Sequence, residues 1–127
     1  MHIEHIAIWT RQLEAQKTFY QVYFSALAGP KYTNPKTHFE SCFLTFATGA
    51  RLELMQAPDV NTFQAAGRMV GYAHMAFSVG SREQVDRLTE RLEADGYRIV
   101  GQPRITGDGY YESVILDLDG NQVEITI

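Results

Sequence analysis

The sequence predicts an α+β fold built from two modules, each with the element order βαβββ. Short alternating or apolar runs, typical of β-strands, recur along the chain, and two longer stretches carry apolar residues at helical spacing. The chain also repeats itself, because the motif His-Ile-Ala-Ile that begins at His5 is echoed by His-Met-Ala-Phe at His74. Such self-similarity indicates two copies of one structural unit.

Length and composition fit one folded domain with a substantial core. The chain has 127 residues, of which 45% are hydrophobic and 20% are charged. We expect a single domain, 1–127, in which module 1 (1–57) and module 2 (72–127) are joined by a connector at 58–71. The module boundaries follow from the repeat and from the glycines and proline of the connector.

The same numbers exclude several classes of partner. A net charge of −4 argues against non-specific nucleic-acid binding, which needs a basic surface. No run approaches the ~20 apolar residues that a membrane span requires. The single cysteine excludes an internal disulfide, and the N-terminal stretch does not have the pattern of a signal peptide. We therefore expect a cytoplasmic protein without nucleic-acid or membrane partners.

In module 1 we expect a helix between the first strand and the later strands. The expected elements are a strand at 2–9, a helix at 11–27, a short strand at 31–34 and a hairpin of strands at 40–47 and 50–57. Thr10 is the expected N-cap of the helix. The apolar positions of that helix are Leu13, Phe19, Tyr20, Tyr23, Phe24 and Leu27. In the connector, Phe63, Met69 and Val70 predict that part of it packs against the fold.

Module 2 repeats this order with clearer helix signals. Ser81 begins a capping-box pattern and Gly96 suits the left-handed position after the helix. Val85, Leu88 and Leu92 fall on one face between them. The expected strands lie at 72–79, 97–102, 110–118 and 121–127.

Each predicted module offers one imidazole and one carboxylate. His5 precedes Glu53 at nearly the same spacing as His74 precedes Glu124. Two imidazoles and two carboxylates suit a borderline divalent ion such as Zn²⁺, Ni²⁺, Co²⁺ or Fe²⁺. The alternative for each residue alone is a solvent-facing position on a strand. Repetition of the pattern in both modules favours the metal site.

Successive side chains of a strand point to opposite faces of the sheet, so their alternation assigns the residues to faces. Further residues also correspond between the two modules. If the four candidate ligands share a pocket face, an apolar set faces the helices. That set comprises Ile6, Ile8, Cys42, Leu44, Phe46, Leu52, Leu54, Val123, Ile125 and Ile127. The pair Glu40-Ser41 is echoed as Glu112-Ser113, and Gly49 as Gly120. A register error of one residue would bury all four candidate ligands under the helices.

Further residues are candidates for substrate contacts. Trp9 and Tyr72 share the predicted pocket face with the histidines, and Arg51 could hold an anionic group. Cys42 is interpreted as a small buried hydrophobe rather than a nucleophile. His2 and His38 have no echo in the other module and are interpreted as surface residues.

These motifs resemble a known family over residues 2–127. The chain is similar to the vicinal oxygen chelate superfamily, which includes glyoxalase I, fosfomycin-resistance proteins, extradiol dioxygenases and bleomycin-resistance proteins. The matching segments are His5-Ile6-Ala7-Ile8, Phe19-Tyr20, Arg51-Leu52-Glu53-Leu54, Gly71-Tyr72-Ala73-His74-Met75-Ala76-Phe77 and Asp117-Leu118-Asp119-Gly120-Asn121-Gln122-Val123-Glu124-Ile125. Leu118 stands where the family's C-terminal signature has proline.

The resemblance implies an open, barrel-like sheet around a metal pocket, and a homodimer. A complete set of four ligands is most similar to the glyoxalase I branch, which isomerises the hemithioacetal of methylglyoxal and glutathione. Glu124 and Glu53 match that branch's catalytic positions. The arginine expected shortly after the first ligand is replaced by Trp9. Two alternatives remain open: a metal-dependent thiol transferase or dioxygenase, and a metal-free module that binds a drug-like ligand.

Overall fold

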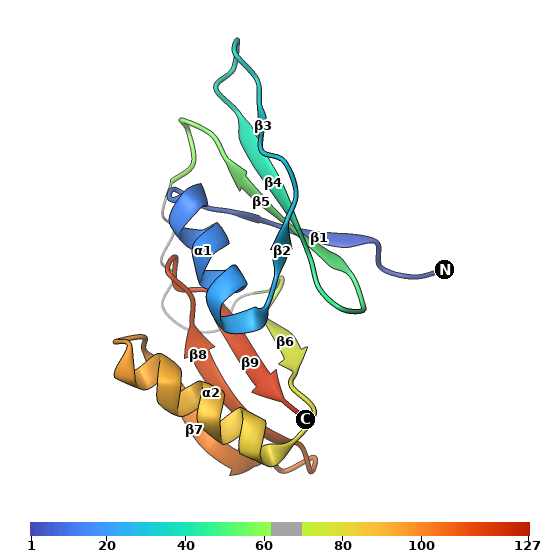
Figure 1. The fold of residues 1–127 in the computed structure, drawn as a ribbon, viewed down its shortest axis with the longest axis vertical. Coiled ribbons are helices and arrows are strands. Elements are labelled where there is room, and N and C mark those ends of the chain that lie inside the picture. Colours follow the sequence, from blue (N-terminus) through green and yellow to red (C-terminus); the bar gives the residue numbers. More distant parts are fainter. Residues whose placement is uncertain (62–69) are drawn as a thin grey trace. The chain divides into compact units, whose positions relative to one another are not determined.

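The computed structural model describes residues 1–61 and 70–127, and the chain forms two compact units, Met1–Gln64 and Ala65–Ile127 (Figure 1). The first contains β1 (His5–Trp9), α1 (Leu13–Phe24), β2 (Leu27–Ala28), β3 (Tyr32–Thr33), β4 (Glu40–Thr45) and β5 (Arg51–Gln56). The second contains β6 (His74–Ser78), α2 (Arg82–Ala94), β7 (Ile99–Ile105), β8 (Tyr111–Leu116) and β9 (Gln122–Thr126). The predicted α+β class is confirmed. None of the described helices is long and apolar enough to span a membrane.

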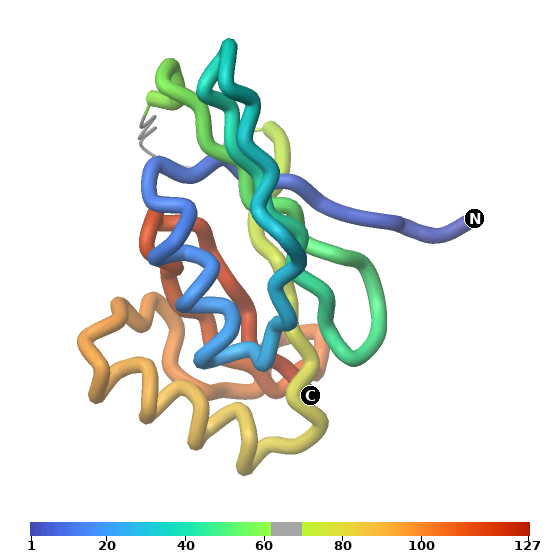
Figure 2. The backbone as a smooth tube through the Cα atoms, turned by 45° about the horizontal axis from the view of Figure 1, so that its top comes forward, coloured from blue at the N-terminus to red at the C-terminus, as the bar shows by residue number. Residues whose placement is uncertain are grey.

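The sheet of the first unit is mixed. Its strand order is β1-β5-β4-β2, with β3 also paired to β4; β1 runs parallel to β5, and the other pairs are antiparallel. The backbone reverses between β4 and β5 in the turn drawn in green in Figure 2. Helix α1 packs on β2, β4 and β5. The buried contact residues are Leu13, Phe19, Tyr20, Cys42, Leu44, Leu52 and Leu54.

The second unit has the same plan with strand order β6-β9-β8-β7. Helix α2 packs on β7, β8 and β9. Its buried Val85 and Leu92 belong to a core that also contains Ile115, Val123 and Ile125. The Ser81 hydroxyl accepts a hydrogen bond from the Gln84 N–H over 3.3 Å, which confirms the predicted cap, and Gly96 adopts φ +89°. The predicted βαβββ order therefore holds in this module.

Strand pairing confirms the face assignment but corrects one echo. Glu53 is paired with Phe43 on one side, and Glu124 is paired with Val114 in the same way. Phe43 and Val114 are therefore equivalent, which makes Ser41 the counterpart of Glu112. The expected match of Glu40-Ser41 with Glu112-Ser113 is wrong by one residue. Because adjacent strand residues face opposite ways, Ser113 lies on the helix side, where its hydroxyl bonds Thr89 over 2.6 Å.

Helix α1 is shorter than the predicted 11–27. It begins at Leu13, whose N–H donates to Oε1 of Gln56 over 2.9 Å, so a residue distant in sequence replaces Thr10 as the cap. It ends at Phe24 because Ser25 adopts a left-handed conformation, φ 54°. Leu27 is therefore not a core residue of the helix, but an exposed residue of β2.

Module 1 departs from a plain βαβββ order, because its second strand is split. Gly29 and Pro30 separate β2 from β3, and proline lacks the N–H that a continuous ladder needs. In module 2 the strand expected at 97–102 begins and ends later, at Ile99–Ile105, with register shifts against β8.

Two apolar positions behave differently from the expectation. Ile127 is exposed beyond the end of β9, although Val123 and Ile125 of the same face are buried. Val70 of the connector is fully exposed rather than packed. Phe63 and Met69 lie outside the described residues.

The turn before β9 is organised by a buried carboxylate. Oδ1 of Asp117 accepts from the N–H groups of Asp119 and Asn121, and Oδ2 accepts from the side-chain amide of Asn121 over 2.9 Å. Gly120 adopts φ +86°, which a side chain would disfavour. The motif that resembles the family signature therefore shapes the turn that delivers Glu124 to its strand.

Replacing Asp117 with alanine should destabilise the protein by about 1–3 kcal/mol, because the part-buried N–H groups of the turn lose their charged acceptor. The free energy of unfolding in urea measures this. Asp59→Ala is the matched control, because Asp59 is exposed and should change stability by less than ~0.5 kcal/mol. Equal stability losses in the two variants would contradict this role of the turn.

Candidate metal centre

Strand register places the first histidine beside the first glutamate. In the parallel pairing of β1 and β5, His5 is paired with Arg51, so Glu53 lies two residues further along the same sheet face. The imidazole Nε2 is 3.9 Å from Oε2 of Glu53. The His5 side chain is 41% exposed and that of Glu53 is 15% exposed. The carboxylate is thus largely withdrawn from water, with an imidazole nitrogen in front of it.

The second unit repeats this arrangement. In the parallel pairing of β6 and β9, His74 is paired with Gln122, and Glu124 lies two residues further along. Nε2 of His74 is 3.2 Å from Oε2 of Glu124. The His74 side chain is 40% exposed and that of Glu124 is 18% exposed. Glu53 and Glu124 stand beside Ala7 and Ala76, whose methyl groups leave space over the sheet.

The structure therefore brings together His5 with Glu53, and His74 with Glu124. Within neither unit, as far as its residues are described, do three or more His, Cys, Asp or Glu side chains gather to hold a metal ion. Each unit thus supplies an N,O donor pair. The donor types fit a borderline divalent cation, and partly buried carboxylates gain from a nearby positive charge.

Electrostatics distinguishes Glu124 among these donors. Burial raises the pKa of its carboxyl above the ordinary value of 4.5, the nearby imidazole of His74 opposes this, and the charge of Glu112 adds to it. A raised pKa makes the ionised carboxylate a stronger base. Because the folded-state pKa exceeds that of the unfolded chain, the stabilising contribution of Glu124 is present at low pH and is lost as the pH rises through the raised pKa.

His5 has contacts that sequence reasoning missed. Nδ1 of His5 and Oε2 of Glu4 are 2.5 Å apart, and the other oxygen of Glu4 bonds Arg51. Period two placed Glu4 on the face opposite His5. Glu4 precedes the first residue of β1, however, so its side chain is not bound by strand alternation. The signal that could have found it is a carboxylate directly adjacent to a candidate ligand.

The three predicted substrate contacts lie in different settings. Trp9 is half exposed and stacks edge-on against Phe39, with ring centroids 6.2 Å apart, and Tyr72 is almost fully exposed. Arg51 is held between Glu4 and the ring of Phe43. Phe39, which also contacts Tyr32, was not singled out from the sequence.

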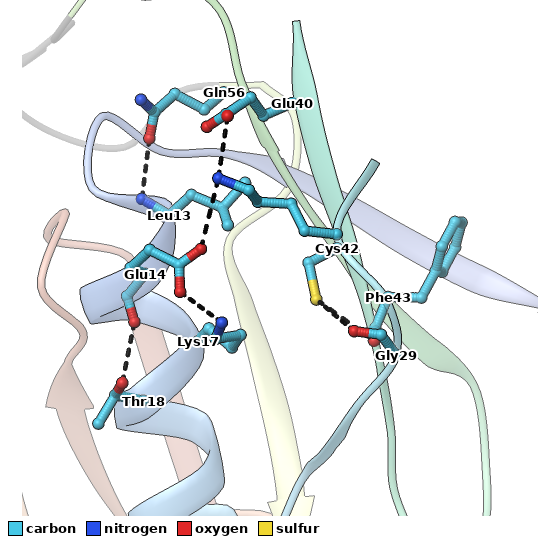
Figure 3. A network of polar contacts seen from close by, with 10 residues as sticks. Leu13, Glu14, Lys17, Thr18, Gly29, Glu40, Cys42, Phe43 and Gln56 are labelled. Carbon is cyan, nitrogen blue, oxygen red and sulfur yellow. Dashed lines mark hydrogen bonds and ion pairs between the residues drawn. The ribbon is translucent and has the colours of Figure 1, made fainter. Parts of the chain in front are cut away.

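The remaining candidate residues, Cys42, His2 and His38, lie in surroundings that indicate structural or surface roles. Sγ of Cys42 is buried and lies 3.4 Å from the carbonyl oxygen of Gly29, and burial raises the pKa of its thiol. Figure 3 marks the contact between Cys42 and Gly29 with a dashed line. This supports a packing role rather than a nucleophilic one. In the same region, Lys31 joins Glu14 of α1 to Glu40 of β4. His2 and His38 are exposed, as predicted.

The carboxyl of Glu124 should titrate above 4.5 in metal-free protein, as followed by carboxyl ¹³C chemical shifts. His74→Ala should raise this pKa further, because the imidazole favours the charged carboxylate. His2→Ala, which removes an exposed imidazole at the N-terminus, should leave it unchanged. A pKa that falls in His74→Ala would contradict the described electrostatics.

Comparisons with known proteins address the family. A sequence model of the Glyoxalase/Bleomycin resistance protein/Dioxygenase superfamily matches residues 2–125. YqjT of Bacillus subtilis (strain 168), an uncharacterised protein, is 28% identical over 129 residues, which are 97% of this chain and 96% of that protein. A possible glyoxalase from Bacillus cereus is 24% identical with a TM-score of 0.74, over 100% of this chain and 99% of its own.

Glyoxalase I from Zea mays has the same fold with a TM-score of 0.81 and 20% identity. That match covers 98% of this chain but 44% of the maize chain, so this chain spans less than half of that protein. At these identities the solved structures establish the fold, and the matched sequence model establishes the family. The chain belongs to the Glyoxalase/Bleomycin resistance protein/Dioxygenase superfamily, also called the vicinal oxygen chelate superfamily.

Proposed function

We propose that the two donor pairs act together on one divalent cation, Zn²⁺, Ni²⁺, Co²⁺ or Fe²⁺, in a glyoxalase I-like lyase. The proposed ligands are His5, Glu53, His74 and Glu124. The observation that carries the proposal is the duplicated pair, because an imidazole Nε2 faces a partly buried carboxylate at the same register in both units. Chance placement of surface residues does not account for this correspondence.

The proposal includes an architecture that unites the pairs. The sheets of modules 1–57 and 72–127, joined through 58–71, form one open, barrel-like sheet around the cation, so the chain acts as a single domain. Each module covers one sheet face with a helix and carries its donor pair on the other face. A pocket needs two such faces, which belong to one chain or to the two chains of a homodimer. Mixing His5→Ala with His74→Ala subunits distinguishes these cases by recovery of metal binding.

The chemistry proposed is isomerisation of a small oxygenated substrate of the lactoylglutathione lyase type. A divalent cation held by these donors would stabilise negative charge that develops on a substrate oxygen. Glu124 takes the proton from one substrate carbon and returns it to the adjacent carbon, so no atom is gained or lost. Burial favours this role because it raises the basicity of the carboxylate. Glu53 is the corresponding carboxylate of the first module.

Substrate contacts are assigned to Trp9, Tyr72 and Arg51. The two aromatic side chains are exposed and can stack on apolar parts of a substrate. The Arg51 side chain is 38% exposed, which leaves part of the guanidinium open to an anionic group. We also propose a cytoplasmic location, because the only cysteine is buried and unpaired.

Two alternatives use the same framework. A metal-dependent thiol transferase or dioxygenase would employ the same cation site with a different substrate. A metal-free binding module is favoured by one observation, the aromatic cluster of Trp9, Phe39 and Tyr32 in the first unit. Calorimetric titration of chelator-treated, folded protein with Zn²⁺, Ni²⁺ and Co²⁺ separates the metal-free module from the metal-dependent enzymes. Absence of saturable binding would overturn the metal proposal and leave the binding module.

Glu124→Gln should lower turnover of the methylglyoxal–glutathione hemithioacetal by about 10²-fold or more, because the base is lost. The urea midpoint should remain close to that of the unaltered protein, since the substitution is nearly isosteric. Glu90→Gln is the matched control, because Glu90 is an exposed carboxylate on α2 and should leave turnover unchanged. Full turnover in Glu124→Gln would show that this residue is neither base nor essential ligand.

A further inference from the structure

The imidazole of His5 is held on its far side as well as facing Glu53. Nδ1 lies 2.5 Å from Oε2 of Glu4, and because a carboxylate only accepts, Nδ1 carries the hydrogen. The second Glu4 oxygen bonds the guanidinium of Arg51, and the Arg51 N–H donates to the Glu4 carbonyl over 3.0 Å. Glu4 is therefore fixed through both its side chain and its backbone.

Phe43 completes this enclosure, which we call the His5 clamp: Glu4, Arg51 and Phe43. The rings of His5 and Phe43 meet edge to face, with centroids 5.4 Å apart and planes at 87°. The guanidinium carbon of Arg51 lies 4.1 Å from the Phe43 ring centroid, a cation–π contact. The Phe43 ring thus contacts both the His5 imidazole and the Arg51 guanidinium, which in turn orients the Glu4 carboxylate.

The second module has no such clamp. Strand register makes Ala73, Gln122 and Val114 the counterparts of Glu4, Arg51 and Phe43. These residues offer no carboxylate, guanidinium or aromatic ring at the corresponding places. The two halves of the proposed site are thus similar in their donors and different in the residues that support them.

We propose that Glu4 is a positioning residue that fixes the ring and tautomer of His5, so that Nε2 is held ready as a metal donor. A hydrogen bond at one imidazole nitrogen determines which nitrogen remains free for a cation, and such partners orient metal ligands. The ring orientation and tautomer of His5 are thus fixed before a metal binds, whereas His74 has no corresponding positioning residue among those that the structure describes. The role in metal binding rests on the proposed function, whereas the tautomer does not.

The tautomer is tested in metal-free protein by ¹⁵N imidazole spectra in alkaline buffer, where histidine side chains are neutral. His5 should be protonated at Nδ1. Glu4→Ala should abolish this preference, and Glu4→Gln should preserve it because the amide oxygen still accepts. Glu90→Ala is the control, since Glu90 is exposed on α2 and its removal changes the net charge equally. An unchanged His5 tautomer in Glu4→Ala would overturn the proposal.

Affinity for Zn²⁺ tests the consequence. Glu4→Ala should weaken binding about 10- to 100-fold, with Glu4→Gln weakened less. Glu90→Ala should bind within about twofold of the unaltered protein, because exposed charges are screened. If the unaltered protein binds no metal while the His5 tautomer responds to Glu4→Ala, the proposed function is wrong. The role of Glu4 in fixing the His5 tautomer is then still supported. If Glu4→Ala binds Zn²⁺ as tightly as the unaltered protein, positioning for metal fails and the metal site stands.

Discussion

The candidate site depends on parallel pairing between the first and last strands of each module. In both modules the histidine is paired with the residue two positions before the glutamate, which sets the two functional groups on one face. A shift of one residue would turn the carboxylate toward the helix and replace it by an apolar side chain. The buried leucines on the opposite face of β5, and Val123 and Ile125 of β9, oppose such a shift.

This constraint explains why the pairs were predictable from the sequence. Alternation in β5 and β9 separates apolar from charged positions, and the repeat links them across modules. Local signals were also sufficient for α2, where Ser81 and Gly96 mark both ends. Long-range contacts were not predictable in the same way. The cap of α1 comes from Gln56, and no spacing rule connects that side chain to Leu13.

Two further differences have other origins. The match of Glu40-Ser41 with Glu112-Ser113 rests on residue types in the sequence. Strand pairing instead makes Ser41 the counterpart of Glu112, so the two alignments differ by one residue. The contact between Glu4 and His5 escapes period two because Glu4 lies before the strand begins. Sequence periodicity therefore predicts faces within an element and is silent about its ends.

The central claim is that the two donor pairs serve one cation. Adding substoichiometric paramagnetic Co²⁺, one of the proposed cations, to the protein while recording imidazole resonances tests it most directly. Our account predicts that His5 and His74 broaden together in proportion to added metal, while the exposed His38 does not. Broadening of His5 or His74 alone, or of neither at saturating Co²⁺, would contradict a shared site.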